Sequence, residues 1–577
     1  MLTHVFIANR GEVAERVART CARLGVRATV STGDYLDPAA QVAQALAAGA
    51  DSVHPGYGFL SENAGFARAV AEAGLVFIGP SPEVMEQMGR KDAAREIAVA
   101  AGVPVVPRGE DAGQELTFPV LVKAAAGGGG KGMRVVRSQA ELEDATAAAK
   151  REARSAFGDD TMLIEKYVER GRHIEVQVIG DTHGSVRHLF ERDCSTQRRH
   201  QKVLEEAPAP TLTDAQRTRV LDAAVALAAH VGYVNAGTVE FLLDDDTGEV
   251  YFLEMNTRLQ VEHPVTEAIT GLDLVELQLR VASGEPLDLP HLTPIGHAIE
   301  ARVYAEDSFG GFLPQAGTAT FVQWPTSVRV DHALASGQTV STAYDPMLGK
   351  VIAHGATREE ARLALVAALD ETAILGLTTN AGFLRILVAS EEFRAATIDT
   401  AWLDRHEVGA PDPAPARELA AWAVFRREET ATGPFCSDGF RLGSDPAPVV
   451  VELDERLALG DPPAEPPVAS VRHDRVEVVH QGQRFVFERP DVMGDQAAAV
   501  ADGALTAPMP GTVLDVRVAA GAAVEEGQVL GVLEAMKMEL SLKAPFAGTV
   551  TDVGAATGDQ VKLGDVLFVV EAPDAPA

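Results

Sequence analysis

Two glutamates lie on neighbouring apolar segments in the middle of the chain. Glu240 falls in residues 237–241 and Glu254 in residues 251–256, with a hairpin-turn pattern between them at 244–248. Two antiparallel strands would set the carboxylates opposite each other, where they repel unless a cation lies between them. Oxygen ligands beside a polyphosphate favour Mg²⁺. The alternative, two acids facing solvent on an edge strand, is disfavoured by their apolar neighbours.

The extended segment that follows carries Arg258, Gln260 and Glu262 at alternate positions. Alternation places them on one face of the segment. A guanidinium offers two parallel donors to a small oxyanion, and a carboxylate beside it can accept a proton. A second cation-rich stretch, residues 198–202, lies in an otherwise acidic chain. It predicts an anion site or, alternatively, a salt-bridged surface loop.

A glycine-rich stretch, residues 127–132, separates the apolar runs 120–123 and 133–136. It lacks the Gly-Lys-Ser/Thr ending of a P-loop and the spacing of a dinucleotide-binding fingerprint. The pattern fits a hairpin lid whose backbone N–H groups wrap the phosphates of a nucleotide, with Lys123 and Lys131 adding charge. A flexible linker is the alternative.

The last 70 or so residues contain an internal repeat. Residues 511–534 and 548–571 align without a gap, and 13 of the 24 paired positions are identical. Each copy alternates apolar and polar residues with glycine at the turns, which predicts a small two-fold-symmetric β-sandwich. Lys537, between Met536 and Met538, is expected at a hairpin turn between the copies. A lysine presented there suits covalent modification, whereas a lysine in any other turn would be an ordinary solvated side chain.

The elements that must position these residues alternate between strands and helices up to about residue 405. The apolar run 4–8, the helical spacing over 13–24 and the strand-like run 26–30 predict the opening of an α/β domain. A long helix is predicted over 213–231, with Thr213 as its cap. After residue 406 a Pro- and Ala-rich stretch and several short alternating runs predict a linker and a small, mostly β module.

Composition excludes several classes of function. The chain has 577 residues, and 50 Lys and Arg against 83 Asp and Glu give a net charge of −33. Such a surface repels phosphate backbones and anionic membranes, so we expect neither nucleic-acid nor membrane binding. We find no 18-residue apolar run and no signal-peptide pattern, and expect a cytoplasmic protein. Cys21, Cys194 and Cys436 are too far apart for a disulfide framework or a spaced metal site.

In combination these features resemble the biotin carboxylase family, an α/β ATP-grasp fold, joined to a biotinyl carrier domain. With that carrier domain, the chain is similar to the α subunit of an actinobacterial-type acyl-CoA carboxylase. The resemblance rests on residues 8–12 (ANRGE), 54–63 (HPGYGFLSEN), 127–132 (GGGGKG), 165–168 (EKYV), 198–202 (RRHQK), 254–264 (EMNTRLQVEHP) and 534–539 (EAMKME).

The resemblance implies an order of domains along the chain. A shortened N-terminal α/β domain (1–90) precedes an ATP-grasp domain (91–330), whose glycine-rich lid spans about 105–170. A C-terminal biotin carboxylase domain (331–406) completes the catalytic part. There follow a linker (407–416), a β-rich subunit-docking module (417–490), a second linker (491–505) and the β-sandwich biotinyl domain (506–572).

The resemblance also implies roles for individual residues. Contacts with ATP are implied for Lys91, Lys123, Gly129, Gly130, Glu165, Val168, His173, His200, Glu240 and Glu254, with Glu165 and Val168 at the adenine. Mg²⁺ or Mn²⁺ would be held by Glu240, Glu254 and Asn256. Bicarbonate would be bound by Lys202, Arg258, Gln260 and Val261, with Lys202 and Arg258 also catalytic. Glu262 would act as general base on bicarbonate, and Arg302 would stabilise the enolate of the biotin carried on Lys537.

The implied reaction begins with attack of bicarbonate on the γ-phosphate of ATP. The carboxyphosphate formed breaks down to CO₂ and phosphate, and the phosphate deprotonates biotin. The implied partners are a biotin protein ligase and a separate carboxyltransferase β subunit, because no stretch resembles a carboxyltransferase domain. The acyl-CoA stays open between 3-methylcrotonyl-, propionyl- and acetyl-CoA; residues 439–442 (GFRL) favour the first slightly and carry the match to a docking module.

The chain departs from the family at its N-terminal end. Residues 29–34 lead almost directly into 35–37, so about one strand of the N-terminal sheet is absent, and the stretch between 106 and 118 is short. Arg329 falls where the family has a dimer contact. A second hypothesis is therefore a carrier and assembly subunit with an inactive ATP-grasp half, which would be biotinylated without turning over ATP. A third, an ATP-grasp ligase without biotin, does not explain Lys537.

Overall fold

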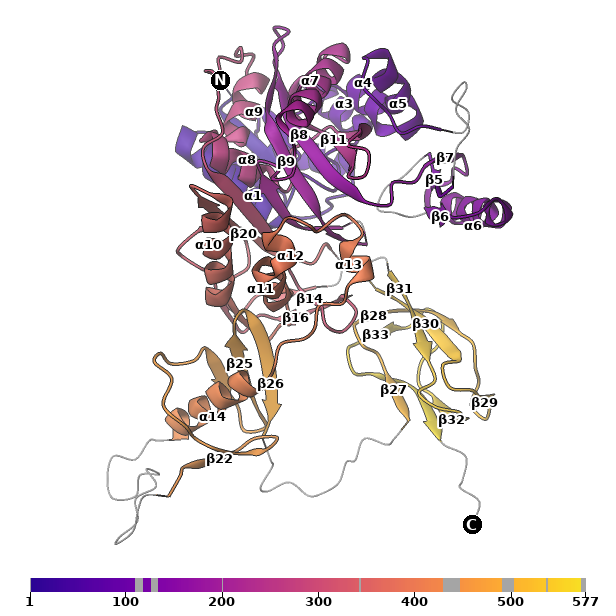
Figure 1. Ribbon diagram of the computed structural model, residues 1–577, viewed down its shortest axis with the longest axis vertical. Helices are drawn as coiled ribbons and strands as arrows, with labels where there is room; N and C mark the ends of the chain where they lie inside the picture. The colour runs from indigo at the N-terminus through magenta and orange to yellow at the C-terminus, as the bar shows by residue number, and fades with distance from the viewer. Residues whose placement is uncertain are drawn as a thin grey trace.

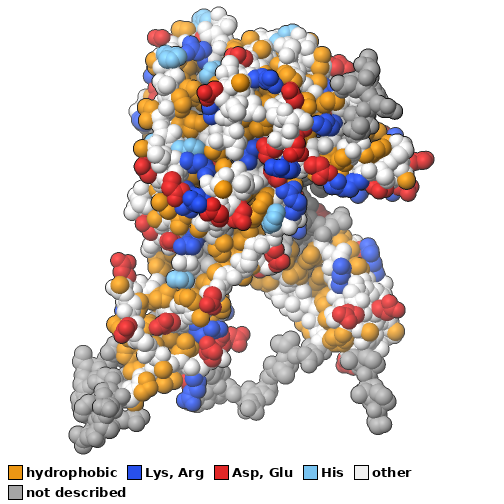
Figure 2. All heavy atoms as spheres, in the orientation of Figure 1, with side chains coloured by type: hydrophobic (Ala, Val, Ile, Leu, Met, Phe, Trp, Pro, Cys, Tyr) orange, Lys and Arg blue, Asp and Glu red, His pale blue; other side chains and the backbone are white. Residues whose placement is uncertain are grey.

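The computed structural model describes residues 2–108, 118–125, 133–199, 201–341, 344–428, 447–489, 503–535 and 538–571. A large body contains the elements up to α13, and two smaller lobes follow it along the chain (Figure 1). Acidic and basic side chains are interspersed on the face of the body drawn in Figure 2. No helix in the described part of the chain is long and apolar enough to cross a membrane.

The chain opens with a parallel sheet of four described strands in the order β2-β1-β3-β4. Strand β2, at one edge, leads into the stretch where the sequence is shortened. Helix α1 buries Val13, Val17 and Cys21, the face that the helical spacing predicted, and ends at Gly25 with φ 70°. The elements are β1 (His4–Ile7), α1 (Gly11–Leu24), β2 (Arg27–Val30), α2 (Pro38–Ala48), β3 (Ser52–His54), α3 (Ala64–Glu72), β4 (Val76–Phe77) and α4 (Pro82–Gly89).

A small lid sheet projects from the body beside helix α6 (Figure 1). Strands β5 and β6 pair antiparallel, with Val120 opposite Val136, so the apolar runs on either side of the glycine-rich stretch form the predicted hairpin. The glycine-rich stretch itself lies outside the described residues. The elements are α5 (Lys91–Ala100), β5 (Val120–Ala124), β6 (Arg134–Val136), α6 (Gln139–Phe157) and β7 (Met162–Lys166).

The centre of the body is a sheet of eight described strands in the order β12-β11-β8-β9-β10-β13-β20-β18. Helix α7 packs on this sheet. Thr213 caps it, as predicted, and the structure adds a reciprocal bond from Gln216. The elements are β8 (Gly171–Gly180), β9 (Val186–Arg198), β10 (Gln201–Ala207), α7 (Asp214–His230), β11 (Asn235–Asp244), β12 (Val250–Asn256), α8 (His263–Thr270), α9 (Leu274–Ala282), β13 (His297–Tyr304), β18 (Arg329–His332) and β20 (Met347–Gly355).

This sheet joins the two domains that the sequence separated at residue 330. Strand β13 pairs with β10 on one side and with β20 on the other, and the expected boundary falls inside β18. Short strands and helices of the C-terminal part cover it. They are β14 (Glu306–Asp307), β15 (Leu313–Pro314), β16 (Gly317–Thr318), β17 (Phe321–Gln323), β19 (Thr339–Val340), α10 (Arg358–Glu371), β21 (Ala373–Leu375), α11 (Ala381–Ala389), α12 (Glu391–Arg394) and α13 (Trp402–Arg405).

The first lobe differs from the predicted β-rich module in beginning with a helix. Helix α14 starts at Ala414, so the linker expected over 407–416 ends three residues earlier. Alanine is the strongest helix former, and Pro415 lies in the first turn of α14, where a proline removes no hydrogen bond of the helix. The elements are α14 (Ala414–Glu428), β22 (Val450–Glu452), β23 (Arg456–Ala458), β24 (Ala469–Val471), β25 (Arg475–His480) and β26 (Gln483–Glu488).

The C-terminal lobe contains two described sheets, β27-β34-β32-β29 and β31-β30-β28-β33. Each sheet combines two strands of one sequence copy with the short strand of the other. Equivalent positions of the copies are buried together in one core, such as Val513 with Val550 and Leu530 with Leu567. The strands are β27 (Ala504–Thr506), β28 (Gly511–Val516), β29 (Ala523–Val524), β30 (Val529–Ala535), β31 (Met538–Lys543), β32 (Gly548–Val553), β33 (Gln560–Val561) and β34 (Val566–Glu571).

Candidate active site

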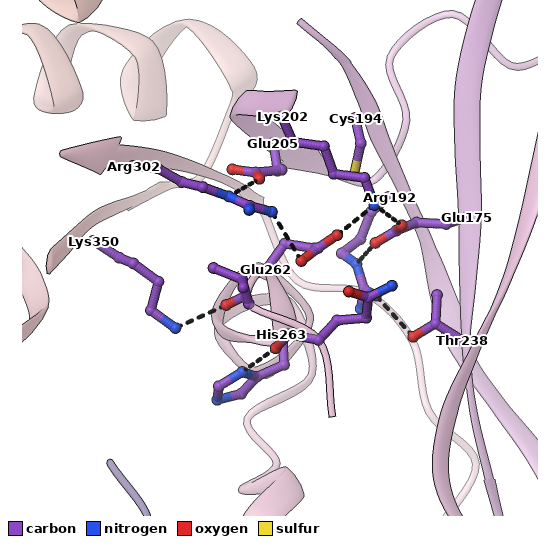
Figure 3. Close-up of polar contacts among 12 residues, drawn as sticks. Glu175, Arg192, Cys194, Lys202, Glu205, Thr238, Glu262, His263, Arg302 and Lys350 are labelled. Carbon is purple, nitrogen blue, oxygen red and sulfur yellow. Dashed lines mark hydrogen bonds and ion pairs between the residues drawn. The ribbon is translucent and has the colours of Figure 1, made fainter. Parts of the chain in front are cut away.

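Lys202, on β10, lies at the centre of a buried group of carboxylates (Figure 3). Its Nζ is 2.6 Å from Glu175 Oε2, 3.0 Å from Glu240 Oε1 and 2.6 Å from Glu262 Oε1. These glutamates come from β8, β11 and the loop before α8, so three parts of the chain meet at one ammonium group. The sequence predicted Lys202, Glu240 and Glu262 but missed Glu175, which is the direct cross-strand partner of Glu240.

The charges of this group hold one another in their ionised forms. Burial by itself lowers the pKa of Lys202, but the surrounding glutamates outweigh it and raise that pKa well above its usual value. Burial likewise favours neutral Glu262, but Lys202 and Arg302 outweigh it and lower the pKa of Glu262 well below its usual range. Arg192, fully buried, supports the group from below by donating to Glu175 at 2.5 Å. Glu262 is therefore an ionised carboxylate at neutral pH.

Arg302 of β13 links Glu262 to a second buried carboxylate. One terminal nitrogen of the guanidinium lies 3.0 Å from Glu262 Oε2, and its Nε lies 2.5 Å from Glu205 Oε1. Burial, the largest effect, raises the pKa of Glu205 to about 7. The sequence missed Glu205, because its role depends on the pairing of β10 with β13, far apart in the chain.

The predicted metal ligands occupy facing positions on the β11–β12 hairpin. Glu240 and Glu254 are direct cross-strand partners, and Asn256 Nδ2 donates to Glu240 Oε1 at 2.8 Å. Burial and the neighbouring charge of Glu240 raise the pKa of Glu254. Two carboxylates and an amide oxygen on adjacent strands form a donor set that suits a hard divalent cation, which would relieve this repulsion. The residues present therefore fit Mg²⁺.

Arg258 and Gln260 lie beside the same hairpin. Gln260 Nε2 donates to Glu240 Oε1 at 3.1 Å, and Arg258 donates to Gln260 Oε1 at 3.0 Å. Arg258 Nε also donates to Glu62 Oε2 at 2.9 Å, and the backbone N–H of Thr257 donates to Glu62 Oε1 at 3.0 Å. Glu62 lies in the HPGYGFLSEN motif, whose role the sequence did not show. From the N-terminal domain, Glu62 thus holds the start of the loop between β12 and α8.

The residues predicted at the nucleotide lie beside this group. Lys123 Nζ and Glu165 Oε2 are 2.5 Å apart across β5 and β7, and Arg108 also pairs with Glu165. His173 Nε2 is 3.0 Å from Glu240 Oε2, so this residue predicted to contact ATP lies beside a predicted metal ligand. Burial lowers the pKa of Lys91, although the charge of Glu254 opposes this effect. Val168 is buried directly after β7.

Other predicted residues lie apart or outside the described part of the chain. The cation-rich stretch divides: Lys202 enters the group above, whereas Arg198 is buried in an ion pair with Glu306 and faces the ring of Phe312. Neither the anion site nor the surface loop therefore describes the whole stretch. Val261 belongs to the loop before α8. Gly129, Gly130, His200 and Lys537 fall outside the described residues, as do residues 439–442.

The structure nevertheless describes the two strands on either side of Lys537, β30 and β31. Ala535 at the end of β30 pairs directly with Met538 at the start of β31, so Met536 and Lys537 alone connect the two strands. The position of Lys537 at a turn between the sequence copies stays a prediction, because the residue itself lies outside the described part of the chain.

Sequence models of four protein families match consecutive parts of the chain. They describe the biotin carboxylase N-terminal domain (residues 28–85), the ATP-binding domain of the carbamoyl-phosphate synthase L chain (81–290), the biotin carboxylase C-terminal domain (300–405) and biotin-requiring enzymes (503–570). The fold and the site thus define an ATP-grasp biotin carboxylase joined to a biotinyl domain.

Curated relatives extend the match over nearly the whole chain. The mitochondrial methylcrotonoyl-CoA carboxylase subunit alpha of Dictyostelium discoideum is 38% identical over 639 residues, covering 93% of this chain and 91% of the relative. Biotin carboxylase 2 of Bacillus subtilis is 45% identical over 445 residues, covering 70% of this chain and all of the relative. The chain belongs to the family of biotin-dependent acyl-CoA carboxylase α subunits, and it is an ATP-dependent ligase of the biotin carboxylase type.

Solved structures agree with this assignment. The biotin carboxylase of Campylobacter jejuni, solved as a β-γ-ATP complex, is 41% identical with a TM-score of 0.67, covering 70% of this chain and 99% of that chain. The biotin carboxylase domain of Hydrogenobacter thermophilus 2-oxoglutarate carboxylase, solved with MgADP and bicarbonate, is 40% identical with a TM-score of 0.67, covering 71% of this chain and 100% of that one.

Proposed function

We propose that this chain uses ATP and bicarbonate to carboxylate biotin attached to its own Lys537, and that a separate carboxyltransferase subunit then transfers the carboxyl group to an acyl-CoA. The observation that carries the proposal is the position of Glu262 between Lys202 and Arg302, beside the facing carboxylates of β11 and β12. One buried group thus contains an ionised base, Glu262, and two cations, Lys202 and Arg302. The facing carboxylates of β11 and β12 beside it suit a divalent cation.

Glu262 is the base in this proposal. Bicarbonate bound at Lys202 and Arg258 would draw the ammonium group of Lys202 away from Glu262, which raises the proton affinity of that carboxylate. Glu262 then takes the proton of bicarbonate, whose oxygen attacks the γ-phosphorus. The bond from phosphorus to the β–γ bridging oxygen breaks, and ADP and carboxyphosphate form. Carboxyphosphate divides into CO₂ and phosphate.

Other residues orient the reactants. Mg²⁺ held by Glu240, Glu254 and Asn256 would neutralise charge on the ATP phosphates. Biotin would supply the ring nitrogen that takes up the carboxyl group, and the phosphate released from carboxyphosphate would accept the proton of that nitrogen. Arg302 keeps its guanidinium at the place where negative charge develops, which is where a fixed cation contributes most to the rate. Lys123 and Glu165 would line the nucleotide-binding site beside the lid.

The test is phosphate release from ATP by the full chain, with and without bicarbonate and free biotin. Bicarbonate-dependent release that rises with biotin supports the proposal. A folded, biotinylated chain without such release would instead support a carrier and assembly subunit. The Lys537→Arg variant separates the two half-reactions: it should lose biotinylation and acyl-CoA carboxylation by at least about 100-fold, yet still cleave ATP with free biotin, because the hydrolytic site does not include the attachment lysine.

We propose 3-methylcrotonyl-CoA as the first acyl-CoA to test, because methylcrotonoyl-CoA carboxylase α subunits are relatives along 93% of the chain. Propionyl- and acetyl-CoA are the competing substrates in the same assay with the partner subunit. The lobe formed by α14 and β22–β26 is the docking surface proposed for that partner, and a biotin protein ligase is the proposed modifier of Lys537. The free, buried thiols of Cys21 and Cys194 fit a reducing compartment, and we propose the cytoplasm.

A further inference from the structure

The loop that carries the bicarbonate residues has little backbone support of its own. It runs from the end of β12 at Asn256 to the start of α8 at His263. Two backbone hydrogen bonds at its end are long: His263 N to Gln260 O at 3.4 Å and Val265 N to Glu262 O at 3.3 Å. The conformation of the loop therefore depends on side chains from other elements, and Glu62 holds only its start.

Lys350 holds the other end of this loop. The residue lies on β20 with 0% of its surface exposed, and its Nζ donates to the backbone carbonyl of Val261 at 2.7 Å (Figure 3). On the neighbouring strand, Arg302 is its direct cross-strand partner and binds the side chain of Glu262. Two cations on paired positions of adjacent strands thus hold two consecutive residues of the loop.

The charge of Lys350 is balanced from the N-terminal domain. Glu12, in the first turn of α1, places Oε2 3.5 Å from Lys350 Nζ and is itself buried. Asp331 lies opposite Lys350 on β18, but it is already paired with Arg19 and Arg329. Glu12 belongs to the ANRGE motif, which lies outside the residues assigned to substrates above. Through Glu12, the ANRGE motif therefore contacts Lys350, the residue that donates to the loop proposed to bind bicarbonate.

Stability of the fold does not account for this arrangement. A buried cation–carboxylate pair costs about as much in lost hydration as it returns, and an apolar pair of similar volume is often equally stable or better. A Lys side chain in this place has one property that an apolar residue lacks: it fixes the position of a carbonyl through a charged donor.

We propose that Lys350 is a positioning residue for the bicarbonate site, which fixes the Val261–Glu262 peptide through the Val261 carbonyl and is itself held by Glu12 of the N-terminal domain. The inference rests on the proposed function, because it assigns a support to the site proposed for bicarbonate. It also explains how the N-terminal domain, which contributes none of the proposed catalytic side chains, acts on the reaction through α1.

The test compares bicarbonate and ATP kinetics in the full-length Glu12→Gln/Lys350→Met variant. Both residues are replaced so that no uncompensated charge stays buried. We expect the KM for bicarbonate to rise about tenfold, because a charged hydrogen bond to the loop is lost, while the KM for ATP stays within about twofold. The control is Arg358→Met/Glu206→Gln, which removes a cation–carboxylate pair away from the loop, with a buried carboxylate and a partly exposed guanidinium, and should leave both constants unchanged within about twofold.

The outcomes separate the inference from the proposed function. A wild-type chain without bicarbonate-dependent ATP cleavage overturns the proposed function, and the inference with it. If the wild type is active, a folded double variant with an unchanged bicarbonate KM overturns the inference alone, as does an equal rise of both constants. If the double variant does not fold, Lys350→Arg decides: its broader guanidinium keeps the charge but displaces the carbonyl, so a bicarbonate KM raised about threefold supports the inference and an unchanged one overturns it.

Discussion

At Lys202, a single ammonium group contacts three carboxylates that would otherwise repel one another, and Arg192 and Arg302 add positive charge beside two of them. This arrangement has two consequences for chemistry. Glu240 and Glu262 stay ionised although they are buried, and each anion that enters the site competes with the carboxylates for the same cation. In the proposed function, bicarbonate binding and the proton affinity of Glu262 would be coupled through Lys202, whose Nζ lies 2.6 Å from Glu262 Oε1.

Glu262→Gln tests the proposed base. The amide keeps the size of the side chain and can still accept from Arg302, but it has no useful proton affinity. We expect bicarbonate-dependent phosphate release to fall at least about 100-fold, which is the lower range for loss of a general base. The affinity for ATP, measured by equilibrium binding, should change less than about threefold. A variant that retains a tenth or more of the activity would exclude Glu262 as the base.

The buried side chain of His54 makes the stability of the N-terminal domain depend on pH. Its Nδ1 accepts from Gly56 N and its Nε2 is paired with Gln278, so the buried ring is neutral. Burial lowers the pKa of His54 from 6.5 to about 4. Between these values the unfolded chain binds the extra proton and the folded chain does not, so the stability of this region falls as the pH drops from about 6.5 to about 4, by up to ~3 kcal/mol.

Hydrogen exchange at the β1 and β3 amides checks this prediction. After correction for intrinsic exchange, opening free energies of the wild type should fall between pH 7.5 and pH 5, and those of His54→Gln should fall less over the same interval. Equal slopes in the two proteins would show that His54 does not cause the loss.

At the scale of elements, the β11–β12 hairpin brings the predicted metal ligands together. Glu240 and Glu254 become partners through the turn between them and a register shift between Glu240 and Phe241. We expect EDTA to abolish bicarbonate-dependent ATP cleavage, and added Mg²⁺ or Mn²⁺ to restore it. Glu254→Gln removes one ligand charge and should raise the Mg²⁺ concentration for half-maximal rate about tenfold. The matched variant Glu249→Gln, on the same hairpin but exposed, should leave the Mg²⁺ curve unchanged.

At the scale of the whole molecule, the first lobe is fixed to the body, and the C-terminal lobe is tethered by a long segment. Glu477 Oε2 accepts from Gly376 N and from Arg484 Nε, both at 2.9 Å, and Arg484 also donates to Thr378. Residues 490–502, between the two lobes, could span at most about 45 Å if fully extended. A partner bound to the first lobe would therefore lie at a fixed place relative to the carboxylase site, within the range of a carrier on that tether.

Arg484→Ala tests the importance of this fixed placement. Loss of the guanidinium removes the nearer of the two cations beside buried Glu477 and leaves only Arg475, at 3.5 Å, so we expect the lobe to be destabilised by about 1–3 kcal/mol. Acyl-CoA carboxylation with the partner subunit should fall several-fold, while bicarbonate-dependent ATP cleavage stays within about twofold. Arg456→Ala, which removes an exposed pair in the same lobe, is the control and should change neither activity. Equal carboxylation by both variants would contradict a role for the anchor.

Sequence determined the chemistry that depends on local order. The facing positions of Glu240 and Glu254 follow from residues close together in the chain, through a hairpin turn and one register shift between the two strands. Arg258, Gln260 and Glu262 lie in a loop and not in the extended segment that their alternation predicted, because side chains of other elements hold that loop. The start of α14 was misread as linker, because proline and alanine occur together there, and a proline in the first turn of a helix, such as Pro415, does not prevent the helix.

Only the tertiary structure decided which distant residues support that chemistry. Glu175, Glu205, Glu62 and Lys350 reach the site from β8, β10, the N-terminal domain and β20, and Glu205 meets Arg302 across a separation of 97 residues. The register between strands so far apart is set by the packing of the complete sheet, which no local pattern encodes. A buried charge gains its role from the partners that this packing brings within a few ångströms of it.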